Sequence, residues 1–77
     1  EQGYAPAQYH LGIAYADGTG TFRDPVRAHM WFNIAAANGY AEAGASRQRL
    51  ASSMGQSEIT LAQARAQQCL DKNYIDC

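Results

Sequence analysis

Cys69 and Cys77 are the pair of side chains with the clearest chemical potential in this chain of 77 residues. Their spacing, across a helix end and a short tail, permits a disulfide if the chain turns back at Asn73. We expect this disulfide, because a cysteine that ends a polar tail has little packing role. The alternative is two free thiols, with Cys69 a small apolar core residue. A disulfide would place the protein in an oxidising compartment, either the periplasm or the cell exterior.

The other reactive residue types do not form recognisable sites. His10 and His29 lack the spacing of zinc-binding histidines and are interpreted as surface or packing residues. Residues 17–20, Asp-Gly-Thr-Gly, lack the lysine of a phosphate-binding loop and the Asp-Thr-Gly order of an aspartyl protease, so we interpret them as a turn. Neither a Ser-x-x-Lys sequence nor paired carboxylates for acid–base work are present. We therefore expect no catalytic residue, no metal site and no cofactor.

Composition and charge argue against two classes of partner. No stretch approaches the roughly 18 apolar residues of a membrane-spanning helix, so we expect no membrane insertion. The formal net charge is −1, and acidic residues lie near both basic pairs, Arg23 with Arg27 and Arg47 with Arg49. A nucleic-acid-binding domain usually presents a basic face. We therefore expect no nucleic-acid partner.

A sequence repeat organises the chain. Residues 3–7, Gly-Tyr-Ala-Pro-Ala, return as residues 39–43, Gly-Tyr-Ala-Glu-Ala, so the period is 39 − 3 = 36 residues. Periods of this length are typical of solenoids, in which each helical hairpin buries its apolar face against a neighbour. Because such arrays generally need about three repeats and only about two hairpins are present, we expect the chain to be part of a longer array.

Local signals predict an all-α fold of about two antiparallel helix pairs. The first helix spans 5–16 and ends in a glycine-containing turn. Asp24 caps the second helix, Pro25 begins it, and Asn38-Gly39 stops it. The third runs from about 41 to 53, and the fourth runs from a cap at Gly55 to about residue 72. The second helix is apolar over a broad face, which predicts that it is covered on more than one side.

Small residues are expected where the first two helices cross. Gly12 and Ala28 remove bulk there, so that Leu11, Tyr15 and Trp31 can interlock around the gap. On this interpretation Leu11 and Tyr15 lie on the inward face of the first helix.

The first 39 residues carry a long spaced pattern of small, aromatic and glycine residues. Its members are Gly3, Ala5, Ala7, Gln8, Leu11, Gly12, Tyr15, Gly18, Gly20, Asp24, Ala28, Trp31, Ala35, Ala36 and Gly39. This pattern resembles one full Sel1-like repeat, a relative of the tetratricopeptide repeat. The second unit shares only its opening, 39–43, and lacks the Leu-Gly pair, the glycine loop and the tryptophan. We therefore divide the chain into a repeat at 1–39 and a degenerate C-terminal capping hairpin with a short tail at 40–77.

The resemblance implies an α/α helical-hairpin solenoid, wound as a right-handed superhelix, that acts as a non-catalytic scaffold or adaptor. Many such proteins occur in bacterial envelope and secretion contexts. One alternative is a purely structural cap of a longer array or of an attached domain. Another is β-lactam binding or hydrolysis, which is linked to some cysteine-rich relatives.

One face of the first helix is the expected surface for a protein or peptide partner. Tyr9, Ile13 and Ala16 lie on a different face from Leu11, and in similar repeats this face lines the concave groove. One period later, the same face of the third helix shows Glu42, Ala45, Arg49 and Ser52. We predict that Tyr9, Ile13, Ala16 and Arg49 contact the partner. The alternatives are packing against an upstream repeat and self-association through the exposed face of the N-terminal repeat.

Overall fold

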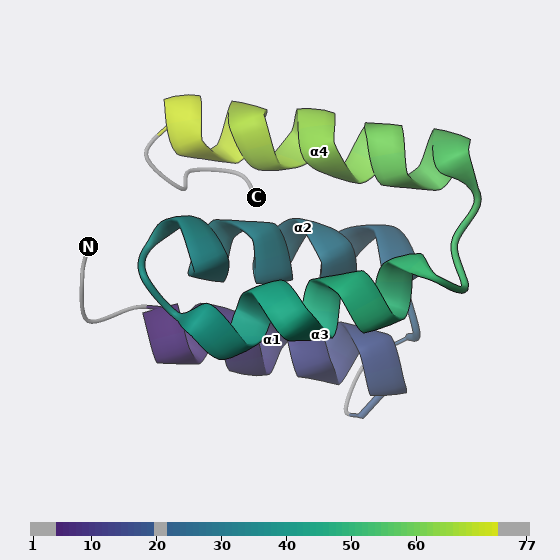
Figure 1. The fold of residues 1–77 in the computed structure, drawn as a ribbon, viewed down its shortest axis with the longest axis horizontal. Helices are drawn as coiled ribbons and strands as arrows, with labels where there is room; N and C mark the ends of the chain where they lie inside the picture. Colours follow the sequence, from purple (N-terminus) through teal and green to yellow (C-terminus); the bar gives the residue numbers. More distant parts are fainter. Residues whose placement is uncertain (1–4, 20–21, 73–77) are drawn as a thin grey trace.

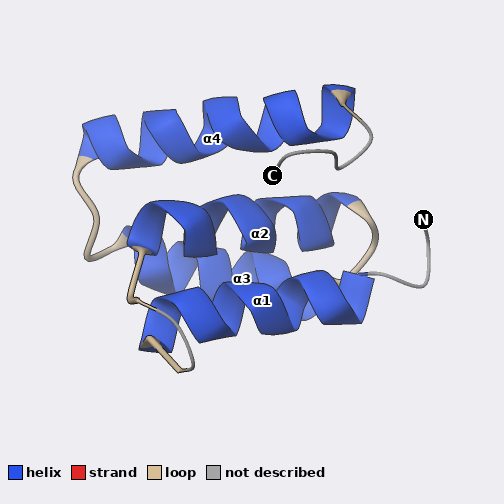
Figure 2. Cartoon of the chain, turned by 180° about the vertical axis from the view of Figure 1, so that it is seen from behind, coloured by secondary structure: helices blue, strands red, loops and turns tan. Residues whose placement is uncertain are grey.

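A computed structural model describes residues 5–19 and 22–72, and every element in these two ranges is a helix (Figure 1). The elements are α1 (Ala5–Asp17), α2 (Pro25–Ala37), α3 (Ala41–Ala51) and α4 (Gln56–Asp71). They form two successive antiparallel pairs joined by short connections (Figure 2). The predicted all-α fold is confirmed.

The predicted start and stop of α2 are confirmed. The Asp24 carboxylate accepts a hydrogen bond from the backbone N–H of Arg27 at 3.2 Å, and Pro25 is the first helical residue. After the helix, Gly39 has a φ of 96°, which side chains with a Cβ rarely adopt. A glycine at this position therefore lets the chain turn at once into α3.

The ends of α3 and α4 are set by local hydrogen bonds. The backbone N–H of Gly55 donates to the Glu58 carboxylate at 2.9 Å, so the glutamate half of the predicted capping box caps α4. The hydroxyls of Ser52 and Ser53 donate to the carbonyls of Arg49 and Leu50 in the last turn of α3. These bonds satisfy carbonyls that would otherwise continue the helix, and α3 ends two residues earlier than predicted.

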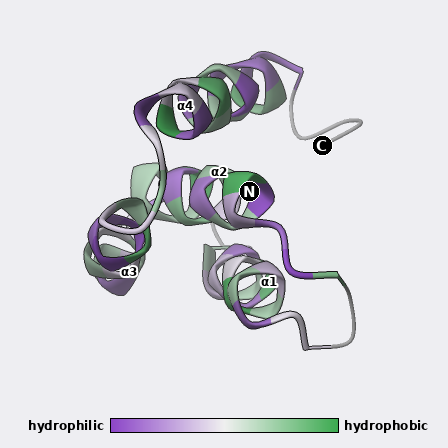
Figure 3. Ribbon diagram, turned by 90° about the vertical axis from the view of Figure 1, so that its right-hand side faces the viewer, coloured by the Kyte–Doolittle hydropathy of each residue, from purple (hydrophilic) through white to green (hydrophobic). Residues whose placement is uncertain are grey.

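The second helix is the centre of the molecule. Seen nearly end-on, α2 lies between α4 on one side and α1 and α3 on the other (Figure 3). It packs directly against all three, and six of its side chains are buried: Ala28, His29, Met30, Phe32, Ile34 and Ala35. The prediction that α2 is covered on more than one side is confirmed.

The core consists of two clusters on opposite sides of α2. The first joins α2 to α1 and α3, and its buried members are Ala28, Phe32, Ala35 and Ala43, flanked by half-buried side chains that include Tyr9, Ile13, Tyr15 and Leu50. The second joins α2 to α4, and its buried members are Met30, Ile34, Ala66 and Cys69, flanked by Trp31 and Leu70.

The structure corrects the packing predicted at the α1–α2 crossing. Leu11, expected to point inward, is 42% exposed, and Trp31 packs against the second cluster instead of against α1. The buried stripe of α1 consists of Ala5, Gln8 and Gly12. Two helices approach closely only where their side chains are small. The large apolar residues of α1 therefore lie beside the contact with α2 and not in it.

Gly12 is the point of closest approach between α1 and α2. A Cβ built on it would lie 2.5 Å from the Cδ1 and Cε1 atoms of Phe32, closer than side-chain atoms can pack. The aromatic ring occupies the space that any other residue would need. The prediction that Gly12 removes bulk is therefore confirmed, with Phe32 as the partner.

Candidate interaction groove

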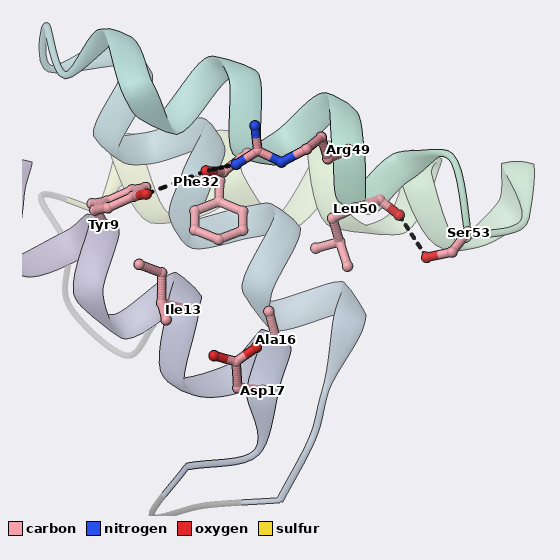
Figure 4. A pocket seen from close by; sticks show the side chains of 9 residues that line it. Tyr9, Ile13, Ala16, Asp17, Phe32, Arg49, Leu50 and Ser53 are labelled. Carbon is pink, nitrogen blue, oxygen red and sulfur yellow. Dashed lines mark hydrogen bonds between the residues drawn. The ribbon is translucent and has the colours of Figure 1, made fainter.

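An open groove of about 400 Å³ runs between α1 and α3 (Figure 4). Phe32 of α2 lies at its base. One wall comes from α1 and the other from α3 and the turn after it; the wall residues are Tyr9, Ile13, Ala16, Asp17, Ser46, Arg49, Leu50 and Ser53. We call this feature the α1–α3 groove.

The two walls are related by a constant sequence offset. α1 and α3 run in the same direction (Figure 1), and the Tyr9 hydroxyl lies 3.4 Å from the Ser46 hydroxyl, 37 residues later. Ile13 and Leu50, with the same separation of 50 − 13 = 37, line the middle of the groove. The offset is one residue larger than the repeat period. Facing residues are therefore not repeat equivalents.

Aromatic rings pack around Tyr9 at one end of the groove. The Tyr9 ring lies 5.7 Å from that of Phe32 and 4.9 Å from that of Tyr40, in tilted arrangements that aromatic pairs favour. Burial and the nearby Glu42 carboxylate raise the pKa of Tyr40. The Tyr40 phenol therefore stays neutral at physiological pH, and the three aromatic rings carry no charge.

A polar cluster lies along the α3 side of the groove. The Arg49 guanidinium donates to the Ser46 hydroxyl at 3.2 Å, and the Tyr9 hydroxyl lies 3.4 Å from the same hydroxyl. Ser46 is only 8% exposed, whereas Arg49 is exposed. Within the described ranges Arg49 forms no ion pair. We call Tyr9, Ser46 and Arg49 the donor cluster.

The structure brings all four residues of the predicted binding surface to this groove. Tyr9, Ile13, Ala16 and Arg49 line it together, although nothing yet tests their role in binding. The expected open face of α1 is not open, because Tyr9 and Ile13 are half-buried against the first cluster, where α3 adjoins them.

Five lining residues were missed by the sequence reasoning: Asp17, Phe32, Ser46, Leu50 and Ser53. Applying the period of 36 to Tyr9 and Ala16 gives Ala45 and Ser52, whereas the groove contains the next residue in each case. Repeat-equivalent side chains on parallel helices point in the same direction, so they do not face each other. The flank of α1 that faces α3 meets the opposite flank of α3. An offset of 37 residues in place of 36 would have predicted Ser46, Leu50 and Ser53.

The predicted Cys69–Cys77 disulfide is not decided by the described structure. Cys69 is buried in the second cluster, and Cys77 lies outside the described residues. The pairing and the oxidising compartment that it implies stay predictions. Intact mass with and without reductant, on protein from its native compartment, would test them.

The two histidines occupy different surroundings. His10 is exposed, and His29 is 2% exposed, with no hydrogen-bond partner for its Nδ1 atom among the described residues. Burial and the Arg47 guanidinium lower the pKa of His29. His29 is therefore a neutral packing residue at physiological pH. It lies outside the α1–α3 groove.

The described residues were also compared with the requirements of a metal site and of a membrane-spanning helix. No three His, Cys, Asp or Glu side chains in these ranges lie close enough together to hold a metal ion. Across the same part of the chain, the helices are too short or too polar for any of them to cross a bilayer.

The second helix is covered by its neighbours, and α1 and α3, the first helices of the two hairpins, run parallel with a groove between them. These features are typical of helical-repeat proteins. In a comparison with protein families, residues 5–40 match the Sel1 repeat. This segment is therefore a Sel1 repeat, and the resemblance predicted from the sequence is confirmed. Repeats of this family typically mediate protein interactions and are generally non-catalytic. No curated protein matches the chain. The assignment of 40–77 as a capping unit stays a prediction.

Proposed function

We propose that the chain is a protein-interaction module whose α1–α3 groove holds an extended segment of a partner protein. The observation that carries this proposal is the groove itself, in which Tyr9, Ile13 and Leu50 surround the Phe32 ring at its base. Partly exposed aromatic and branched aliphatic side chains beside hydrogen-bonding groups are the usual composition of a binding site.

The size and shape of the groove support a short segment as its ligand. Its volume of about 400 Å³ lies at the lower end of the range for ligand sites, and it is open to solvent. A few side chains of an extended peptide can therefore enter while the rest of the peptide stays outside. In this proposal the module serves as part of a scaffold or adaptor. If Cys69 and Cys77 form the predicted disulfide, the expected compartment is the periplasm or the cell exterior.

A peptide selection with a matched pair of variants tests this function. Linear peptides would be selected from a phage-displayed library on the folded chain, and their affinities measured for Ser53→Trp and Ser57→Trp. Both serines are exposed, but only Ser53 lines the groove. Because the indole of Ser53→Trp would occupy the groove, we expect at least a tenfold loss of affinity there. Ser57→Trp, on α4, should bind as the original chain does.

Two results would contradict the proposal. The first is that no peptide is selected by a chain whose circular dichroism shows the expected helix content. The second is that the selected peptides bind both tryptophan variants equally well, which would locate their site elsewhere. Either result would favour the structural-cap alternative for this segment.

A further inference from the structure

We infer that the α1–α3 groove selects segments carrying an Asp or Glu side chain beside an aliphatic one. The carboxylate would bind the donor cluster of Tyr9, Ser46 and Arg49, and the aliphatic side chain would lie between Ile13 and Leu50. This inference rests on the proposed function and specifies the chemistry of the partner.

Some N–H and O–H groups of the donor cluster donate to no acceptor among the described residues. Arg49 uses one of its five N–H groups on the Ser46 hydroxyl, and Ser46 and Tyr9 share one hydrogen bond between their two hydroxyls. Whichever hydroxyl donates, the other keeps its proton. One hydroxyl proton and four guanidinium protons are therefore available to a ligand. A group that only accepts hydrogen bonds fits this surplus, and a carboxylate is such a group.

Charge points to the same ligand. Arg49 forms no ion pair within the described ranges, and the acidic lining residue, Asp17, lies two turns of α1 beyond Tyr9, about 12 Å along the helix axis. A carboxylate at the donor cluster would gain a charge-assisted hydrogen bond next to a serine that is 8% exposed. The same carboxylate at the Asp17 end would meet a like charge. Glu42, whose carboxylate lies beside Tyr40, is not among the residues that line the groove. The lining carboxylate in the described ranges is that of Asp17, so the lining favours an acidic group at the donor-cluster end.

The apolar neighbours of the donor cluster define the second element of the ligand. One turn along each wall from Tyr9 and Ser46 lie Ile13 and Leu50, both half-buried and both against the first cluster. Side chains two residues apart in an extended peptide point to the same side, about 7 Å from each other. An acidic residue and an aliphatic residue with this spacing match the two parts of the groove. Because the groove is open to solvent, a peptide need not end in it, and we assign the acid to an internal side chain and not to a chain terminus.

The test measures how the peptide's acid and Arg49 depend on each other. A peptide selected on the chain would be made with an amidated C-terminus, as the Glu (or Asp) form and the matching Gln (or Asn) form. Both would be titrated against the original chain, Arg49→Gln and Arg65→Gln. Arg65 is exposed on α4, away from the groove, and its loss changes the net charge equally.

We expect the amide form to bind the original chain about tenfold more weakly than the acid form, since desolvated charge pairs contribute on this scale. In Arg49→Gln the two forms should bind within about twofold of each other, whereas Arg65→Gln should keep the tenfold difference and its weakening at high salt.

Three outcomes would overturn the inference and leave the proposed function standing. The first is selection of groove-binding peptides, sensitive to Ser53→Trp, that lack acidic residues. The second is an equal preference for the acid form in Arg49→Gln and in the original chain. The third is peptides that bind only with a free C-terminal carboxylate. Failure to select any groove-binding peptide would instead count against the proposed function.

Discussion

The two sides of α2 solve the same packing problem in different ways. On one side, α4 packs the small residues Ala66 and Cys69 against Met30 and Ile34, and aliphatic and sulfur-containing side chains fill the contact. On the other side, α1 and α3 meet α2 through aromatic rings and small residues, and their walls stay apart above Phe32.

The two sides of α2 therefore differ in shape, because only the side with α1 and α3 leaves a groove. The second cluster lies between α2 and α4 alone, and its residues are buried in that contact. The first is formed by three helices, and three parallel or antiparallel cylinders leave a depression between the outer two. Polar side chains can line that depression because Arg49 is exposed there and Ser46, which is buried, accepts a hydrogen bond from Arg49. A groove thus follows from the placement of α3 beside α1.

The largest effect is expected from removing the ring shared by the core and the groove. Phe32 is 3% exposed, so Phe32→Ala should lower the free energy of unfolding by about 3–5 kcal/mol. Ile34→Val, on the other side of α2, should cost about 0.5–1.5 kcal/mol and leave peptide binding intact. Urea denaturation and peptide titration would measure both. A loss below about 1 kcal/mol for Phe32→Ala would mean that the first cluster is not a true core.

The next effect compares two helical glycines. Gly12→Ala should cost about 1–3 kcal/mol, because its Cβ would meet the Phe32 ring at 2.5 Å. Gly44→Ala in α3 should raise the free energy of unfolding by about 0.5–1 kcal/mol, because no atom lies within 4 Å of its Cβ and alanine is the better helix former.

Thermal and urea unfolding of both glycine variants would show opposite signs. Phe32→Leu in the Gly12→Ala background should recover part of the loss. If Gly12→Ala were as stable as Gly44→Ala, the close approach of α1 and α2 would be wrong.

A smaller effect is expected from the donor cluster. Tyr9→Phe keeps the ring contacts with Phe32 and Tyr40 and removes the hydroxyl 3.4 Å from Ser46. Because this hydrogen bond is long and half-buried, its loss should cost about 0.5 kcal/mol. Denaturation midpoints at equal slope would measure it. A cost above about 2 kcal/mol would show that the cluster holds the fold together and is not kept for a ligand.

The pH dependence of stability concerns the buried histidine. Burial and Arg47 lower the pKa of His29 below its ordinary value of 6.5, so the unfolded chain binds the proton more readily than the folded one. The contribution of neutral His29 is present above pH 6.5 and is lost as the pH falls through the lowered pKa. Urea denaturation between pH 7.5 and pH 5 should show this loss, and His29→Gln should reduce the slope. An unchanged slope would assign the dependence to other groups.

Local signals were sufficient for much of the fold. Asp24, Pro25, Gly39 and Glu58 act on backbone groups within a few residues, and their roles are those predicted. The sequence pattern also identified α2 as the covered helix, and the repeat that it placed at 1–39 overlaps the Sel1 match at 5–40. The prediction for Leu11 was wrong. It assumed that large apolar residues form the contact between α1 and α2, whereas small residues form it.

The sequence by itself determined the four helices, the repeat and the side chains available on each face, because capping and helical periodicity act over one or two turns. Only the tertiary structure decided which flank of α1 faces α3. That rotation depends on the contact between Gly12 and Phe32, which lie on different helices and fit each other only once both are folded. The offset of 37 residues across the groove, and with it the meeting of Tyr9, Ser46 and Arg49, follows from that contact.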